Sequence, residues 1–196
     1  MTPAARLLID ASRAWSDLSD DEARQLALTF HERTVTAGDP VALPDAEAHE
    51  ILFVAEGLLR FYYPSDDGRQ SNKAFVGEGE FAGALAASAL GVPLAYGIEA
   101  LEDTRLLACD VTAWTALVES APAFERLGRK LAEYILVRKE RTARSLRLQS
   151  ATERYATLVE ERPDLVQRVP LYHLASYLGM SDVHLSRVRR QLAEAI

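Results

Sequence analysis

The sequence predicts an α+β fold, with an antiparallel β-barrel of the jelly-roll kind, one long helix and a C-terminal helix-turn-helix. Short β-branched and aromatic runs separated by turn residues fill residues 34–110, which is typical of such a barrel. A helical stretch without internal proline covers residues 123–148, and two short helical patterns joined by a glycine follow near the end of the sequence. We therefore expect three units, at residues 1–121, 122–149 and 150–196.

The N-terminal unit opens with a short amphipathic helix after Ser19, which forms the pattern of a capping box with Glu22. Turn signals such as Gly38-Asp39-Pro40 then separate a series of short strands. An alanine-rich segment at residues 83–91 is expected to form a helix between two of them. The expected strands lie at residues 34–36, 51–57, 58–64, 73–81, 96–102 and 104–110.

The long helix has one apolar face with two candidate partners. A long helix with a single apolar seam is suited to pairing with its twin in a homodimer. Packing of the same seam on the chain's own barrel is the alternative. After the helix, Ser150 and Glu153 form a second capping-box pattern, which marks a hinge and opens the next helix. The seam consists of Phe124, Leu127, Leu131 and Ile135.

The last 27 residues have the pattern of a helix-turn-helix. Pro170 suits the first turn of a helix, and Gly179 stands where the chain needs a left-handed residue on leaving that helix. Ser181 is a good N-cap for the second helix, which has an apolar stripe at Leu185, Val188 and Leu192. In this motif the second helix lies in the major groove of DNA. An ordinary helical hairpin in a protein core is the alternative.

Charge is distributed unevenly along the chain. The net charge of −7 divides into 8 Lys/Arg and 19 Asp/Glu over residues 1–110, a balance of −11, and 14 against 10 over the remainder, a balance of +4. Phosphates repel the acidic part, so only the C-terminal part is suited to approach a nucleic acid.

Other classes of function lack support in the sequence. A single cysteine, Cys109, excludes a disulfide framework or a cysteine-cluster metal site and indicates a reducing compartment. No apolar run approaches the roughly 20 residues that span a bilayer, so we expect a cytoplasmic protein without a membrane partner. His173 and His184 are expected near DNA rather than at a metal. No glycine-rich phosphate loop or nucleophile–base set appears, so neither an enzyme nor a cofactor is expected.

The order of these parts resembles the Crp/Fnr family of bacterial transcription regulators. The segment ILFVAEGLLRFYY at residues 51–63 is similar to the family's strand-glycine-strand passage, and residues 79–83 with 93 and 98–101 are similar to its phosphate-binding cassette. The hinge SATERY and the segment RVPLYHLASYLGMSDVHLSRVRRQL resemble its DNA-binding domain. The resemblance covers nearly the whole chain. It implies a cyclic-nucleotide-binding-type barrel, a dimerisation helix and binding to double-stranded DNA.

The cassette departs from that of family members that bind a cyclic nucleotide. Their pattern resembles Gly-Glu-x-x-Gly-Glu and then Arg-Ser or Arg-Thr, with the glutamate on the ribose and the arginine on the phosphate. Here the glutamate, arginine and hydroxyl positions are Ala84, Leu94 and Ala95. The missing charge-assisted bonds contribute roughly 1.5–3 kcal/mol each, so we predict no response to cyclic AMP or cyclic GMP. The candidate effector pocket comprises Gly79, Glu80, Phe81, Gly83, Ala84, Leu94 and Ala95.

The family resemblance places the recognition helix from Ser181 to about Leu192. Arg187 aligns with the family's base-reading arginine, and a bidentate arginine–guanine pair is the commonest specific contact. Two protomers are expected to place these helices on a pseudo-palindromic site. The candidate DNA-binding residues are Ser181, Asp182, Val183, His184, Ser186, Arg187 and Arg190.

Three further expectations concern the wing of the helix-turn-helix, the role of the barrel and the alternative function. Because the sequence stops shortly after Leu192, we expect a helix-turn-helix that lacks a full wing. The barrel either binds an unidentified small-molecule effector or serves as a fixed dimerising platform. The alternative function is a cyclic-nucleotide-fold module that binds a ligand or a protein and no specific DNA sequence.

Overall fold

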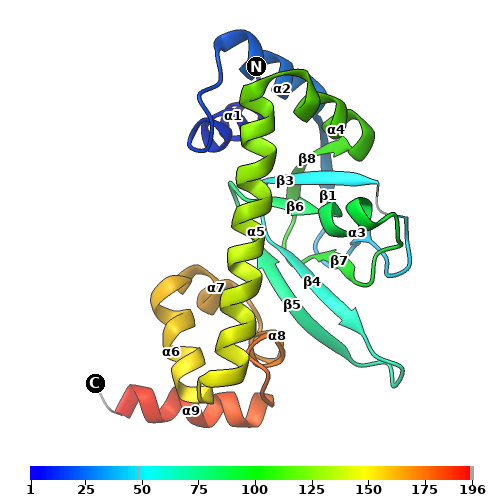
Figure 1. The fold of residues 1–196 in the computed structure, drawn as a ribbon. Helices are drawn as coiled ribbons and strands as arrows, with labels where there is room; N and C mark the ends of the chain where they lie inside the picture. The colour runs from blue at the N-terminus through cyan, green and yellow to red at the C-terminus, as the bar shows by residue number, and fades with distance from the viewer. Residues whose placement is uncertain (48, 195–196) are drawn as a thin grey trace.

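The computed structural model describes residues 1–47 and 49–194. Figure 1 shows a β-barrel beside one long helix, with the C-terminal helices gathered at the end of that helix far from the N-terminus. The strands are β1 (His31–Val35), β2 (Pro40–Ala42), β3 (Glu50–Glu56), β4 (Leu59–Pro64), β5 (Gln70–Val76), β6 (Phe81–Gly83), β7 (Gly97–Ala100) and β8 (Thr104–Asp110). The helices are α1 (Pro3–Arg13), α2 (Asp20–Thr29), α3 (Leu85–Leu90), α4 (Val111–Ser120), α5 (Pro122–Leu148), α6 (Ala151–Glu161), α7 (Pro163–Arg168), α8 (Leu171–Tyr177) and α9 (Asp182–Glu194).

The strands form two antiparallel four-stranded sheets, in the orders β1-β8-β3-β6 and β2-β7-β4-β5. Strand β3 pairs with both β8 and β6, and strand β4 pairs with both β5 and β7. This arrangement confirms the antiparallel barrel that the short runs separated by turn residues predict. Strand β2 was not predicted, because a three-residue strand gives a weak periodic signal. Helix α1 was not predicted either, although its apolar residues recur at helical spacing.

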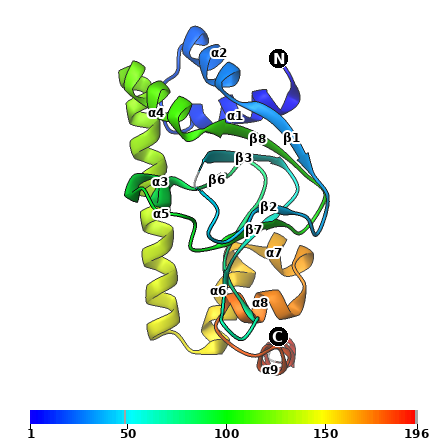
Figure 2. The same ribbon diagram turned by 90° about the vertical axis from the view of Figure 1, so that its right-hand side faces the viewer.

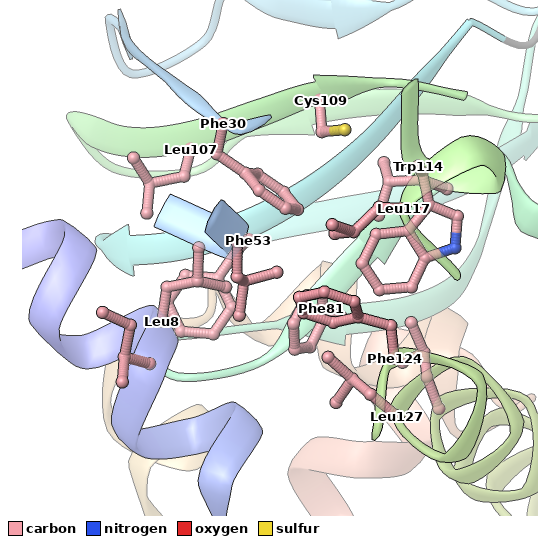
Figure 3. Packing of buried hydrophobic residues seen from close by; sticks show 14 of the residues in the cluster. Leu8, Phe30, Phe53, Phe81, Leu107, Cys109, Trp114, Leu117, Phe124 and Leu127 are labelled. Atoms are coloured by element: carbon pink, nitrogen blue, oxygen red, sulfur yellow. The ribbon is translucent and has the colours of Figure 1, made fainter. Parts of the chain in front are cut away.

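The alternation of side chains along β3 separates two hydrophobic cores. Leu52 and Val54 point between the two sheets and pack with residues of β4, β7 and β8. Ile51 and Phe53 point to the opposite face, where α1, α2, α4 and the first half of α5 cover the sheet. Successive residues of a strand face opposite sides, so one segment supplies both cores. Figure 3 shows the second core, with Phe53, Phe81 and Trp114 meeting Phe124 and Leu127 of α5.

The apolar seam of α5 packs within its own chain. Phe124, Leu127 and Leu131 are each 1% exposed in the core under the β1-β8-β3-β6 sheet, and Ile135 packs against the edge of this core. The assignment of Phe124, Leu127 and Leu131 to a dimer interface is therefore wrong, whereas that of Ile135, which is only partly buried, stays a prediction. Side chains already covered by α1, α4 and the barrel have no surface left to offer a second copy. Packing on the chain's own barrel, the alternative given above, is what the structure shows.

A third core joins the C-terminal helices to the barrel. Leu58 and Phe75, from the β4-β5 part of the barrel, pack with Tyr155, Leu158 and Leu174 of helices α6 and α8. Figure 2 shows these helices below the barrel, with α9 at the lower end of the molecule. The helix-turn-helix is thus packed against the β4-β5 hairpin.

Local signals mark several element boundaries correctly. Both predicted capping boxes form, at Ser19–Glu22 and Ser150–Glu153. Pro163 begins α7, where a proline at the first helical position leaves no donor unsatisfied. No helix in the described part of the chain is long and apolar enough to cross a membrane.

Candidate nucleic-acid interface and effector site

Helix α9 presents a polar face to solvent and an apolar face to the protein. Leu185 and Val188 are 0% and 2% exposed and pack into the third core. The Ser181 hydroxyl accepts a hydrogen bond from His184 N at 3.2 Å, which confirms the expected N-cap. The candidate residues Ser181, Asp182, Val183, His184, Ser186, Arg187 and Arg190 are all exposed. The structure therefore brings these seven residues onto one accessible helix, where their contact with DNA remains a prediction.

The turn between α8 and α9 depends on Gly179. Its φ of +66° lies in the left-handed region, as the sequence predicted for the residue after the first helix. Buried Ala175 is the small residue that lets α8 and α9 approach closely. The two helices thus have the layout of a helix-turn-helix with its second helix outward.

His173 faces the barrel and not the outer surface of the motif. It is 8% exposed, and its Nδ1 atom lies 3.0 Å from Asn72 Nδ2 of strand β5. Burial, assisted by the charge of Arg60, lowers the pKa of His173 to about 4. The expectation that His173 lies near DNA is therefore wrong; the β4-β5 hairpin covers that side of α8.

Two ion-pair clusters hold the C-terminal helices against the barrel. Arg168, at the end of α7, donates to Glu78 at 2.8 and 2.9 Å and to Glu102 at 2.7 and 3.0 Å. These contacts lower the pKa of Glu78, chiefly through the hydrogen bonds from Arg168. Glu80 accepts from Tyr134 and Arg138 of α5 at 3.0 Å each, and Arg162 lies 3.7 Å from its other oxygen.

The contacts that Asn72, Arg168 and Glu102 form between the units were not predicted from the sequence. A single arginine or asparagine carries no periodic signal, and its partner lies 66 or more residues away along the chain. Only the positive charge of the segment from Arg162 to Arg168 beside an acidic barrel pointed toward such contacts.

The predicted effector pocket does not form as one site. Ala84 and Leu94 are buried between the sheets, packed with residues of β3, β4 and β7, whereas Ala95 is exposed. Phe81 points to the opposite side of β6 and packs with Trp15 and Trp114. Glu80 points to α5, as described above. Membership of Glu80, Phe81 and Ala95 in one pocket is therefore wrong, because side chains alternate across β6 and its flanking turn.

The two cassette glycines serve the backbone. Gly83 has φ +110°, and a Cβ atom there would lie 2.4 Å from the carbonyl oxygen of Glu50. Gly79 has φ +78° in the turn before β6, where a Cβ would meet no atom within 4 Å. Gly83 is required for close pairing of β6 with β3, and Gly79 only for the turn.

A lysine lies among the aromatic rings at the end of the same core. Lys73 Nζ is 3.3 Å from the ring centroid of Tyr96 and 5.5 Å from that of Tyr63. Burial lowers the pKa of Lys73 to about 8, and the charge of Lys139 contributes. The Tyr96 hydroxyl donates to the carbonyl of Gly83 at 3.0 Å. Tyr96 belongs to the same buried cluster as Leu94, so an aromatic ring and an aliphatic side chain occupy this part of the barrel interior.

A metal site and a reactive thiol both have little support among residues 1–47 and 49–194. No group of three or more His, Cys, Asp or Glu residues is arranged there to hold a metal ion. Cys109 is fully buried, and burial raises the pKa of its thiol to about 11. It behaves as a small hydrophobic residue.

Comparisons with known proteins agree with this architecture. Residues 32–121 match the model of the cyclic nucleotide-binding domain family. The comparison with curated proteins found no match. Among solved structures, FixK2 from Bradyrhizobium japonicum is similar with a TM-score of 0.77 and 21% identity, covering 85% of each chain.

Two further structures extend the similarity over nine-tenths of the chain. The catabolite activator protein of Thermus thermophilus has a TM-score of 0.58 and 24% identity, covering 91% of this chain and 85% of its own. A putative Crp/Fnr-family transcriptional regulator from Eubacterium rectale has a TM-score of 0.70 and 18% identity, covering 91% and 85%. Residues 32–121 thus match the cyclic nucleotide-binding domain family, and the chain as a whole shares its fold with these three solved structures, one of which is a Crp/Fnr-family regulator.

Proposed function

We propose that this protein is a homodimeric, sequence-specific DNA-binding transcription regulator that does not respond to cyclic AMP. The observation that carries the proposal is helix α9, which is anchored by buried Leu185 and Val188 and presents Arg187 and Arg190 to solvent. Anchored apolar residues fix the helix, while exposed arginines supply donors for guanine edges and phosphates. The proposed DNA contacts are the seven residues from Ser181 to Arg190 named above.

The case against a cyclic nucleotide rests on the barrel interior. The position of the phosphate-binding arginine is Leu94, which is 2% exposed, and that of the ribose-binding glutamate is Ala84, which is 3% exposed. Neither side chain can donate or accept a hydrogen bond. Titration calorimetry with cyclic AMP tests this part of the proposal, and a micromolar affinity would contradict it.

Dimerisation requires a surface other than the buried seam of α5. Away from the buried seam, this helix exposes Leu136 at 65%, one turn after the exposed small residue Ala132, and these two form a stripe. Val137, 48% exposed, lies about 100° around the helix from Leu136. Exposed apolar residues at the middle of a long helix are suited to helix–helix pairing. We propose that this stripe pairs with its copy. Sedimentation of the Leu136→Glu variant tests it, and an unchanged dimer mass would exclude this stripe.

Selection of bound DNA from a random pool tests the main proposal. The wild type is expected to enrich an inverted repeat, and Arg187→Ala is expected to lose that enrichment, since one bidentate pair contributes about 1–3 kcal/mol of discrimination. Arg189→Ala is the matched control, because it removes the same charge from the same helix at an exposed position outside the proposed set.

The outcome also separates the two candidate functions. Equal enrichment by wild type and Arg187→Ala would exclude base reading by Arg187. No enrichment at low salt would favour a cyclic-nucleotide-fold module that acts through a ligand or a protein. The expectation of a missing wing concerns the end of the sequence, where residues 195–196 lie outside the described residues, and it stays a prediction.

A further inference from the structure

Two neighbouring cavities lie outside the barrel, where α5 passes α6 and the helix-turn-helix. Their volumes are about 660 and 570 Å³, within the range of sites that hold small molecules. They share the side chains of Arg141, Thr142, Glu161, Arg162 and Tyr177. The barrel interior is packed with Leu94 and Tyr96, whereas these cavities leave room for a ligand.

The smaller cavity is strongly basic. We call it the α5–α6 cavity; its charged lining residues are four arginines, Arg141, Arg144, Arg154 and Arg162, and one acid, Glu161. Four positive charges against one negative charge give a balance of +3. Hydroxyl and amide groups of Thr142, Ser145, Gln149 and Thr157 complete the polar lining. An anion with several acceptor oxygens suits such a lining.

The four arginines divide into two that are held and two that are free. Arg154 donates to the carbonyl oxygens of Leu178 and Gln149 at 2.8 and 2.6 Å, and Arg162 donates twice to Asp164 at 3.0 Å. Arg141 and Arg144 form no hydrogen bond or ion pair with the described residues. Fixed cations therefore lie beside uncommitted guanidinium donors, and guanidinium groups match phosphate oxygens in pairs.

The α5–α6 cavity is lined by residues of α5 and of the helix-turn-helix. Its lining from α5 belongs to the helix whose first half packs on the barrel, and Leu178 lies directly before the Gly179 turn into α9. A ligand in contact with α5 and with the helix-turn-helix binds more tightly to one relative position of these two parts than to others. Such a difference in affinity couples ligand binding to the position of α9.

We propose that the α5–α6 cavity binds a small phosphorylated anion through Arg141 and Arg144, and that this binding biases the position of the recognition helix. Phosphate is favoured over carboxylate because its three oxygens and its higher negative charge offer more acceptor positions to several guanidinium groups than the two oxygens of one carboxylate do. Binding of the anion is independent of the function proposed above; only its effect on DNA binding rests on that function.

Titration calorimetry of the full chain with inorganic pyrophosphate, at low ionic strength and without DNA, tests the binding step. The wild type is expected to bind, and Arg141→Ala and Arg144→Ala are each expected to weaken binding by about tenfold or more. Arg126→Ala is the control, since Arg126 is exposed on the same helix and lines neither cavity. Circular dichroism establishes that each variant is folded.

Several results would overturn the proposal. Absence of pyrophosphate binding would do so, as would an equal loss in Arg126→Ala, which would indicate unspecific charge attraction. Tighter binding of citrate than of pyrophosphate would overturn the assignment to phosphate. If Arg141→Ala weakened only DNA binding, the arginines would be contacts to the DNA backbone instead. Conversely, Arg141-dependent pyrophosphate binding by a protein that selects no DNA would refute the proposed function and leave the anion site standing.

Discussion

Asn72 Nδ2 lies 3.0 Å from His173 Nδ1 and 3.1 Å from the carbonyl oxygen of the same histidine. Because Asn72 Oδ1 accepts from Arg60 Nη1 at 3.2 Å, the two amide hydrogens of Asn72 point toward His173. His173 Nδ1 therefore acts as an acceptor and carries no proton. The contact joins strand β5 to the first helix of the helix-turn-helix, and it is compatible only with a neutral imidazole.

The neutral state of His173 predicts a dependence of stability on pH. The unfolded chain protonates this histidine near pH 6.5, whereas burial and Arg60 lower its pKa in the folded protein to about 4, against the opposing charge of Glu99. Protons thus bind the unfolded state first, so the free energy of unfolding falls as pH drops from about 6.5 to about 4, by at most about 1.4 kcal/mol per pH unit. Below that range no further loss arises from this group.

Urea unfolding between pH 7 and pH 4 measures this effect. The difference in free energy of unfolding between wild type and His173→Gln isolates the contribution of His173, since the carboxylates titrate alike in both proteins. If the free energies of unfolding of the two proteins changed with pH in parallel, protonation of His173 would not be the cause of the loss.

The Arg168 cluster predicts that one side chain stabilises the docking of the helix-turn-helix. Arg168→Ala removes four hydrogen bonds to Glu78 and Glu102 and leaves these acids without a cation. We expect a loss of about 1–2 kcal/mol and faster proteolysis near the hinge. Arg105→Ala is the control, because its pair with Glu56 is 3.4 Å long and exposed, and such pairs contribute little. Equal effects of the two substitutions would contradict the prediction.

The cassette glycines predict a large difference between two similar substitutions. In Gly83→Ala the new Cβ would lie 2.4 Å from Glu50 O, so β6 must move from β3, and we expect a loss of about 3 kcal/mol or more. Gly79→Ala has the strained φ but open space, with an expected loss of about 1 kcal/mol. Thermal unfolding of both variants measures this, and equal melting temperatures would show that strand pairing does not require Gly83.

The packing of α5 predicts a stability effect without an effect on association. Leu131→Ala empties a buried site, with an expected loss of about 2–5 kcal/mol in the free energy of unfolding. Leu28→Ala is the control, since Leu28 is 80% exposed on α2 and should change stability little. Chemical denaturation compares the two. A dissociated oligomer with unchanged protomer stability would return Leu131 to an interface.

Patterns within a few residues of one another determined what the sequence could predict. The capping boxes at Ser19 and Ser150, the left-handed Gly179 and the N-cap Ser181 all depend on contacts over three or four residues. Helical spacing along α9 likewise indicated which of its side chains turn inward. Because these contacts are local, the fold class and the exposed face of α9 followed from the sequence.

Tertiary structure alone decided which surfaces meet. The seam of Phe124, Leu127 and Leu131 had two chemically equivalent partners, and only the placement of α1 and α4 over the barrel assigned it to the core. Likewise, Glu80 belongs by sequence to a cassette, but the neighbouring Arg138 of α5 draws its carboxylate away from the barrel interior. The type of a side chain indicates whether its partner is apolar or charged, but it does not indicate which residue that partner is. Burial and ion pairing depend on chain segments that lie far apart in the sequence.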